Sequence, residues 1–141
     1  MGRSKTTYKN IDTVVEKIMA EYIDDIRKNI DVAAKKVAKK GALALKNDSA
    51  QFTARWGTGK YQKGWRVTEE QHVWFKSYVI HNAKSPVLTH LLEYGHQLEG
   101  VYNGHVYDGS TRTEAFPHIT PVAKKVVDEF ERSVKSAIQR S

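Results

Sequence analysis

The chain has 141 residues, no cysteine and a formal net charge of +7 at pH 7. This length suits one domain that buries its own core, and the missing cysteine excludes disulfides, thiolate catalysis and cysteine-based zinc sites while suiting a protein made in a reducing cytoplasm. Because the N-terminal MGRSKTTYKN is polar and basic and no apolar run reaches the ~18 residues that cross a bilayer, we expect neither a signal peptide nor a membrane span.

The first predicted element is a long helix that starts near residue 10. Apolar residues recur at three- and four-residue steps from Ile11 to Ala38, which is the period of an amphipathic helix. We expect it to end near Gly41 or about one turn later, so that it outruns a compact domain of this size. A break near residues 29–31, giving two packed helices, is the alternative. Residues 1–9 have no apolar period and are expected to form a flexible arm.

The positive charge raises the question of a nucleic-acid partner, because clustered Lys and Arg gain affinity by releasing counterions from phosphate. The densest basic run is the group of four lysines between residues 35 and 40, at the spacing of one helix face. The acidic pair Asp24 and Asp25 precedes it on the same predicted helix. We interpret the run as the solvated face of an amphipathic helix.

A hairpin is predicted after the long helix. Residues 47–60 lack periodicity and are expected to form a loop, with Phe52 and Trp56 against the core. Two extended segments follow, at residues 63–69 and 72–81, the second rich in aromatic and β-branched residues. We expect them to pair antiparallel through the Glu-Glu-Gln turn. Because the second is apolar on both faces, the long helix should cover one face and the C-terminal helix or a neighbouring subunit the other.

The segment from residue 88 to residue 121 differs most from a sequence that only packs a core. Leucines at i, i+3 and i+4 spacing predict a short helix over residues 88–94, ended by Gly95, which can adopt the left-handed conformation at little cost. Three glycines among Asn, Asp and Ser then predict a mobile surface loop at about residues 97–112. A short strand near residues 114–116 is an alternative for the end of this segment.

The last predicted element is an amphipathic helix from about Pro121 to Gln139. Thr120 before Pro121 is an N-cap followed by proline at the first helical position. The order of elements predicts a single α+β domain over residues 10–141. It has a long N-terminal helix, an antiparallel β-hairpin or small sheet, a short central helix and a C-terminal helix packed on the sheet.

Catalytic and metal chemistry is not indicated. His90, Glu93 and His96 fall at i, i+3 and i+6, with His105 and His118 further on, but i, i+6 is a poor pair on a helix and the spacing matches no zinc signature. Paired carboxylates or histidines in the same stretch have no diagnostic spacing for acid–base hydrolysis. The segment GTGKYQKG lacks the phosphate-loop pattern and precedes a strand instead of following one. We therefore expect no enzyme, no metal and no cofactor.

Nucleic-acid binding through aromatic residues is the second functional hypothesis. Three aromatic residues lie among basic residues on the predicted hairpin: Trp65, Trp74 and Tyr78, with Lys63, Arg66 and Lys76. Such an arrangement can stack bases beside phosphate-binding cations. Aromatic residues on a strand more often fill a core, so packing is the preferred interpretation.

Three segments together resemble a known family. They are residues 57–60, GTGK, ahead of the first strand; residues 88–96, LTHLLEYGH; and residues 115–121, AFPHITP, before the last helix. They are similar to the T-G-x-L-like turn, the L-x-E-[FY]-G segment and the [RA]-P-F/H-[LI]-x-P-A ending of a bacteriophage tail-component family, that of gene product ten of HK-type lambdoid phages. Tyr61 departs from the leucine that is frequent there, and residues 97–112 are longer and richer in glycine than in the shortest members.

The resemblance implies a structural protein of the virion neck or tail end, made in the host cytoplasm, which completes the tail or joins it to the head connector. It implies no catalytic residue. The implied partners are further copies of the chain, which form a homo-oligomeric ring of about six subunits, a hexameric ring. Other head-connector and tail proteins are implied as well, and DNA would pass through the ring. No membrane is implied. We expect interface or loop-anchoring roles for Glu93, Tyr94, His96, Phe116 and His118; the alternative is that Tyr94 and Phe116 fill the core.

Overall fold

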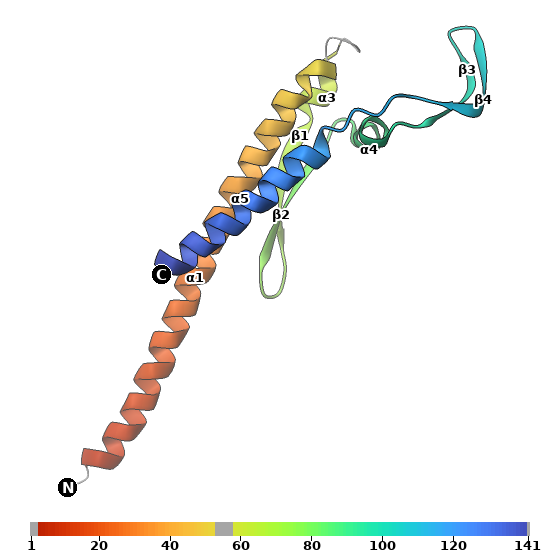
Figure 1. Ribbon diagram of the computed structural model, residues 1–141. Helices are drawn as coiled ribbons and strands as arrows, with labels where there is room; N and C mark the ends of the chain where they lie inside the picture. Colours follow the sequence, from red (N-terminus) through yellow and green to blue (C-terminus); the bar gives the residue numbers. More distant parts are fainter. Residues whose placement is uncertain (1–2, 53–57, 141) are drawn as a thin grey trace.

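The computed structural model describes residues 3–52 and 58–140, and its fold is α+β as predicted (Figure 1). The two β-hairpins are separate two-stranded antiparallel sheets. Trp56, predicted to lie against the core, is outside the described residues. The elements in chain order are α1 (Arg3–Asp48), α3 (Lys60–Lys63), β1 (Trp65–Gln71), β2 (Lys76–Asn82), α4 (Pro86–Tyr94), β3 (Gln97–Tyr102), β4 (His105–Arg112) and α5 (Ile119–Arg140).

The first helix is longer than the sequence pattern predicts. α1 has 46 residues, about 70 Å at 1.5 Å per residue, and it runs through residues 29–31 without the predicted break. It is already helical at Arg3, within the predicted arm, because a helix once nucleated propagates without needing an apolar period. Gly41 lies inside the helix, where Val126 of α5 and Ile80 of β2 pack over it.

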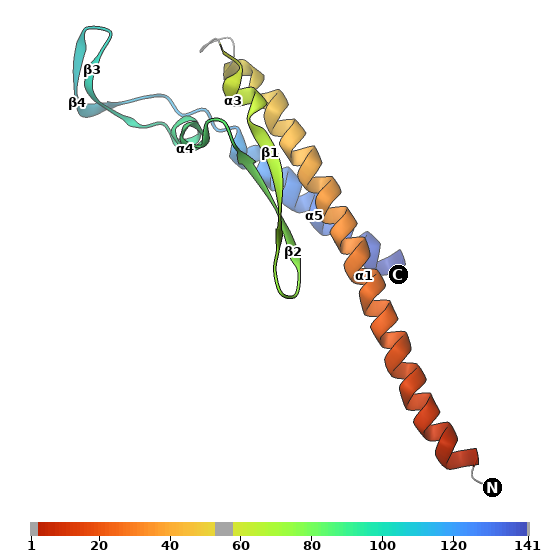
Figure 2. The same cartoon turned by 180° about the vertical axis from the view of Figure 1, so that it is seen from behind.

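The two halves of α1 have different surroundings. The C-terminal half lies against α5 and the β1–β2 hairpin, whereas the N-terminal half projects away from the rest of the molecule (Figures 1 and 2). The buried residues gather at the C-terminal half: Leu45, Phe52, Tyr61, Trp65, Leu92 and Val122. The core therefore lies around the C-terminal half of α1 and leaves the N-terminal half outside it.

Aromatic rings pack edge to face within this core. The ring of Tyr61 lies 5.8 Å from that of Phe52 and 5.6 Å from that of Trp65, which is the favoured geometry for aromatic pairs. Phe52 is 3% exposed, so its predicted position against the core is confirmed.

The first hairpin pairs Trp65 with Asn82 at one end and Gln71 with Lys76 at the other. The predicted hairpin is confirmed, but its turn was placed too early, because the Glu-Glu-Gln segment belongs to β1. Because β1 stays paired with β2 as far as Gln71, Glu69 lies opposite Tyr78 and within 3.5 Å of the Lys76 ammonium. Such cross-strand pairs favour the longer strand.

The tip of this hairpin is therefore formed by residues 72–75. Val73, Trp74 and Phe75, which the sequence placed in a covered strand, are 87%, 78% and 61% exposed. Within the single chain this stretch is not covered on both faces, although the tip lies beside the middle of α1 (Figure 2). Cover by a neighbouring subunit, which the prediction allowed, stays a prediction.

The predicted surface loop at residues 97–112 is a second hairpin, β3–β4, which projects from the side of the molecule opposite to the free end of α1 (Figure 1). Asn103 and Gly104 form its turn, both at positive φ, as tight hairpin turns require. Gly109, at φ 89°, lies where the register shifts between Leu98 and Glu99. The glycines thus mark a turn and a bulge, which composition alone does not distinguish from an irregular loop.

The two remaining helices differ from prediction at their starts. α4 begins at Pro86 and ends before Gly95, whose φ of 70° is positive as predicted, although its ψ of 175° lies outside the left-handed helical region. α5 begins at Ile119, so Thr120 lies within its first turn and is not its N-cap. Residues 114–116 form no strand in the described chain. The cap of α5 comes instead from α4.

Candidate functional site

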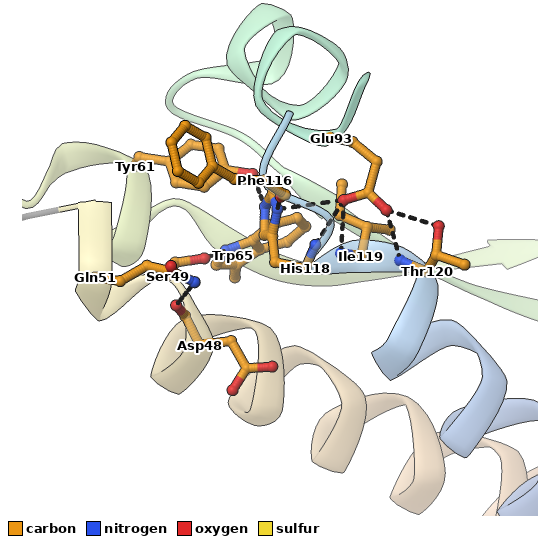
Figure 3. A network of polar contacts seen from close by, with 10 residues as sticks. All are labelled: Asp48, Ser49, Gln51, Tyr61, Trp65, Glu93, Phe116, His118, Ile119 and Thr120. Carbon is orange, nitrogen blue, oxygen red and sulfur yellow. Dashed lines mark hydrogen bonds and ion pairs between the residues drawn. The ribbon is translucent and has the colours of Figure 1, made fainter. Parts of the chain in front are cut away.

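A buried carboxylate joins the end of α4 to the start of α5 (Figure 3). Glu93, 4% exposed, accepts hydrogen bonds from the backbone N–H groups of His118, Ile119 and Thr120, each at 2.8 Å, and from the Thr120 hydroxyl at 2.6 Å. The first N–H groups of a helix have no partner within the helix. α5 has no acidic residue in its own first turn, so Glu93 caps it from another element.

The same contacts determine the ionisation of Glu93. Burial by itself would raise the pKa of this carboxyl group, but the hydrogen bonds from the Thr120 hydroxyl and from the backbone of Ile119, Thr120 and His118 outweigh it and lower the pKa to about 2. The positive end of the α5 dipole also favours an anion there. Glu93 is therefore a structural carboxylate, ionised at neutral pH and occupied by four donors.

His118 continues the network into the aromatic core. Its Nδ1 lies 2.8 Å from the carbonyl oxygen of Phe116 and 3.2 Å from Glu93, and its Nε2 lies 2.6 Å from the Tyr61 hydroxyl. A carbonyl oxygen only accepts, so Nδ1 carries a proton, and in the neutral ring Nε2 accepts from Tyr61. Burial, together with the nearby Glu93 charge, raises the pKa of Tyr61 and keeps its hydroxyl a donor.

The network extends to Trp65 and Ser49 in the core. The Trp65 indole N–H donates to the Ser49 hydroxyl at 2.9 Å beside the His118 ring (Figure 3). Within the described chain, every buried side-chain nitrogen and oxygen has a hydrogen-bond partner. Glu93, His118 and Tyr61 are aligned like a proton relay, yet they lie in the core and hold two helices together.

Three of the five residues predicted for an interface or a loop anchor lie in or on this core. Glu93 and His118 are 4% and 3% exposed. The Phe116 ring packs edge to face 5.9 Å from Phe52, and its backbone N–H donates to the Leu92 carbonyl at 2.7 Å. These three residues anchor the segment before α5 within the subunit and offer little surface to a partner.

The other two residues flank Gly95. His96 anchors the base of the second hairpin: its N–H donates to the Thr113 hydroxyl at 2.9 Å, and the Thr113 N–H donates to its carbonyl at 2.8 Å. Tyr94 is 61% exposed, with its ring 5.0 Å from that of His90. The alternative that Tyr94 fills the core is wrong, whereas Phe116 does pack against it.

The histidines considered for a metal are dispersed. His90 lies on the exposed side of α4, His105 begins β4, and His118 is enclosed by the core. No cluster of three or more His, Asp or Glu side chains that could hold a metal ion occurs among the residues the structure describes.

The aromatic residues considered for nucleic-acid stacking do not form one surface. Trp65 is 7% exposed, and the Tyr78 hydroxyl donates to Asp31 at 2.6 Å. Trp74 is 78% exposed at the hairpin tip, where the Phe75 ring stacks on that of His72 at 4.4 Å. The structure therefore separates the three residues into a core residue, a residue that contacts α1 and an exposed tip.

The projecting half of α1 carries an apolar stripe that the rest of the described chain leaves uncovered. Its members are each between 42% and 57% exposed: Ile11, Val14, Val15, Ile18, Met19, Tyr22 and Ile23. The helical period of these residues was visible in the sequence. The sequence did not show which part of this long stripe the rest of the chain covers.

A second apolar surface is a groove of about 500 Å³ between α1, the tip of the β1–β2 hairpin and α5. Sequence reasoning missed it, because it placed the tip residues inside a covered strand. The apolar residues that line it are Ile30, Ala34, Val73, Trp74, Phe75 and Phe130, and its charged lining residues are Arg27, Lys28, Asp31 and Lys76.

No helix in the part of the chain that the structure describes combines the length and apolarity needed to cross a bilayer. Comparisons of the chain with protein-family models, with curated proteins and with solved structures found no match. The two apolar surfaces and the resemblance carried by the three sequence segments are therefore the features that bear on function.

Proposed function

We propose that the chain is a structural subunit of a bacteriophage neck or tail end, which assembles with copies of itself into a ring and completes the tail or joins it to the head connector. The observation that carries the proposal is the presence of two uncovered apolar surfaces, the stripe on α1 and the groove beside the hairpin tip. Contiguous exposed apolar patches mark interaction sites. Two different patches on one subunit suit the head-to-tail contacts of a cyclic ring.

The elongated shape supports the same proposal. The free half of α1 and the β3–β4 hairpin project on opposite sides of the core (Figures 1 and 2). Val101 and Val106 of that hairpin are 68% and 81% exposed. Projections of this kind add little packing to their own subunit, but they extend its reach toward neighbours. The net charge of +7 suits a ring through which DNA passes.

The test is electron microscopy of the purified protein over a range of concentrations, together with the identity of the genes that flank its coding sequence. We expect closed rings, and genes for portal, head-closure and major tail proteins on either side. Neighbouring genes of ordinary cellular metabolism, with a protein that stays monomeric at every concentration, would contradict the proposal.

A basic nucleic-acid-binding module is the second candidate. It is favoured by exposed Trp74 and Phe75 next to Lys76 at the hairpin tip, since aromatic rings beside cations bind single strands by stacking. Filter binding of DNA at low and high salt separates the two candidates. A structural subunit should bind weakly, whereas tight binding that falls steeply with salt and is lost in Trp74→Ala would favour the module.

A further inference from the structure

The apolar stripe and the groove lie on consecutive parts of one helix. The stripe occupies residues 11–23, and α1 contributes residues 27–34 to the groove. α1 is uninterrupted over both parts, and a helix folds back on itself only at a break or sharp kink. The stripe therefore cannot enter the groove of its own chain, and a stripe that fills the groove must belong to another molecule.

The charge of the stripe segment disfavours symmetric pairing. Residues 10–25 contain five acidic residues against one lysine, a net charge of −4. Packing two such segments against each other would bring −4 beside −4, and like charges at close range repel. A partner surface for the stripe should therefore be apolar at its centre and basic at its edges.

The groove has this composition. Its charged lining residues are Arg27, Lys28 and Lys76 against Asp31, three cations and one anion, and Asp31 already accepts the Tyr78 hydroxyl. Lys28 and Lys76 pair with Asp24 and Glu69 at 2.9 and 3.5 Å, but these pairs are exposed to solvent. Exposed ion pairs are weak, so these lysines are available to an incoming acidic helix.

We propose that the groove of one subunit receives the apolar stripe of the next subunit's α1. In this contact Ile18 and its apolar neighbours cover Trp74 and Phe75, and the acidic flanks of the stripe face Arg27 and Lys28. The contact joins two different patches, so it repeats from subunit to subunit. That these repeated contacts close into a ring rests on the proposed function. The contact itself is the one that would build the ring.

Disulfide cross-linking tests this contact directly, because the chain has no cysteine of its own. Ile18→Cys and Val73→Cys proteins, mixed and oxidised, should form a disulfide-linked heterodimer. A chain that carries both substitutions should give a ladder of oligomers. Val106→Cys, on the other hairpin and 81% exposed against 87% for Val73, is the matched control and should not cross-link to Ile18→Cys.

The outcomes separate this contact from the proposed function. Dimers of Ile18→Cys alone, as abundant as the mixed product, would overturn head-to-tail docking in favour of symmetric helix pairing. Equal cross-linking to Val106→Cys would overturn the choice of groove. If electron microscopy shows rings and the mixed product is missing, the contact fails while the ring stands. If the mixed product forms without rings, the contact stands and the ring fails.

Charge reversal gives a second readout on the same surfaces. Glu16→Lys with Glu21→Lys should weaken association roughly tenfold or more by removing the complementary charge. A mixture of that protein with an Arg27→Glu, Lys28→Glu protein should associate again, because the mixed contact restores opposite charges. Failure of the mixture to recover, with both proteins folded by circular dichroism, would overturn the assignment of the acidic flank to these residues.

Discussion

Glu93 keeps a charge inside the core because the start of α5 supplies the donors that water would otherwise supply. Three of them are backbone N–H groups, and the fourth is the Thr120 hydroxyl. Without Glu93, those N–H groups would be buried next to His118 with no acceptor. One side chain therefore satisfies a helix terminus, positions His118 and connects α4 to α5.

Replacing Glu93 by glutamine should destabilise the protein. Glu93→Gln keeps the shape of the side chain, but it turns an NH₂ group toward N–H donors and removes the charge. Leaving buried donors unpaired and losing a charge-assisted cap should lower the free energy of unfolding by about 2–4 kcal/mol, measured by urea denaturation. Glu99→Gln, at an exposed position of β3, is the control and should change it by less than about 0.5 kcal/mol.

The low pKa of Glu93 also predicts a pH dependence. The folded state lowers this pKa from 4.5 to about 2, so the stabilisation is fully present above about pH 4.5 and is lost as the pH falls toward about 2. The shift corresponds to roughly 3 kcal/mol. Acid titration of the unfolding free energy should therefore be steeper in the natural protein than in Glu93→Gln. Equal slopes between these pH values would contradict the assignment.

Tyr61 tests the other end of the network. Tyr61→Phe retains the aromatic packing but leaves the Nε2 atom of buried His118 without its donor at 2.6 Å. We expect a loss of about 1–3 kcal/mol in the free energy of unfolding, measured by thermal or chemical denaturation. Tyr94→Phe removes the same hydroxyl group from a residue that is 61% exposed and should be nearly neutral.

At the scale of elements, the fold depends on the close approach of α1, β2 and α5. Gly41 lies at this crossing: a Cβ atom there would lie 2.7 Å from Val126 Cγ2 and 2.8 Å from Ile80 Cδ1. The predicted helix end at Gly41 reflected the general preference of glycine for helix ends. Here glycine is used because a side chain would separate the helices.

Gly41→Ala should therefore destabilise the protein despite the better helix propensity of alanine. Propensity favours alanine by about 1 kcal/mol, while overpacking a filled core costs about 1–3 kcal/mol. Removing the clashing methyl groups with Val126→Ala should relieve the strain, so a double-mutant cycle measured by urea denaturation should give a favourable coupling between the two substitutions. Additive effects would indicate that the crossing has room for the extra carbon.

At the scale of the whole molecule, the subunit has a packed core from which the N-terminal half of α1 and the β3–β4 hairpin project (Figure 1). Helix that lacks tertiary packing is only marginally stable in water, and residues 10–25 are exposed throughout. Their amide hydrogens should therefore exchange much faster than those of residues 37–45. If the stripe docks on another subunit, protection of residues 10–25 in hydrogen-exchange mass spectrometry should rise with protein concentration. Protection that is independent of concentration would contradict the docking.

Local periodicity in the sequence was sufficient to predict α1, the β1–β2 hairpin, α4 and α5. These elements depend on the spacing of apolar residues and on turn chemistry. Both are patterns among residues that are only a few positions apart in the sequence. The β3–β4 hairpin was missed because Asn and Gly at positive φ are common to hairpin turns and to irregular loops. The tip of the first hairpin was placed too early for a different reason: the polar Glu-Glu-Gln segment was interpreted as the turn, and the apolar residues 73–75 as part of the second strand.

The sequence by itself determined that α1 has one continuous apolar stripe, that a glycine with positive φ ends α4, and that most elements have the type observed. Only the tertiary structure decided which part of the stripe is covered, because α5 packs against the C-terminal half of α1 and leaves residues 11–23 exposed. It also decided that Glu93 caps a helix starting 26 residues later at Ile119. Both depend on contacts between distant parts of the chain, and a local pattern of residues carries no information about them.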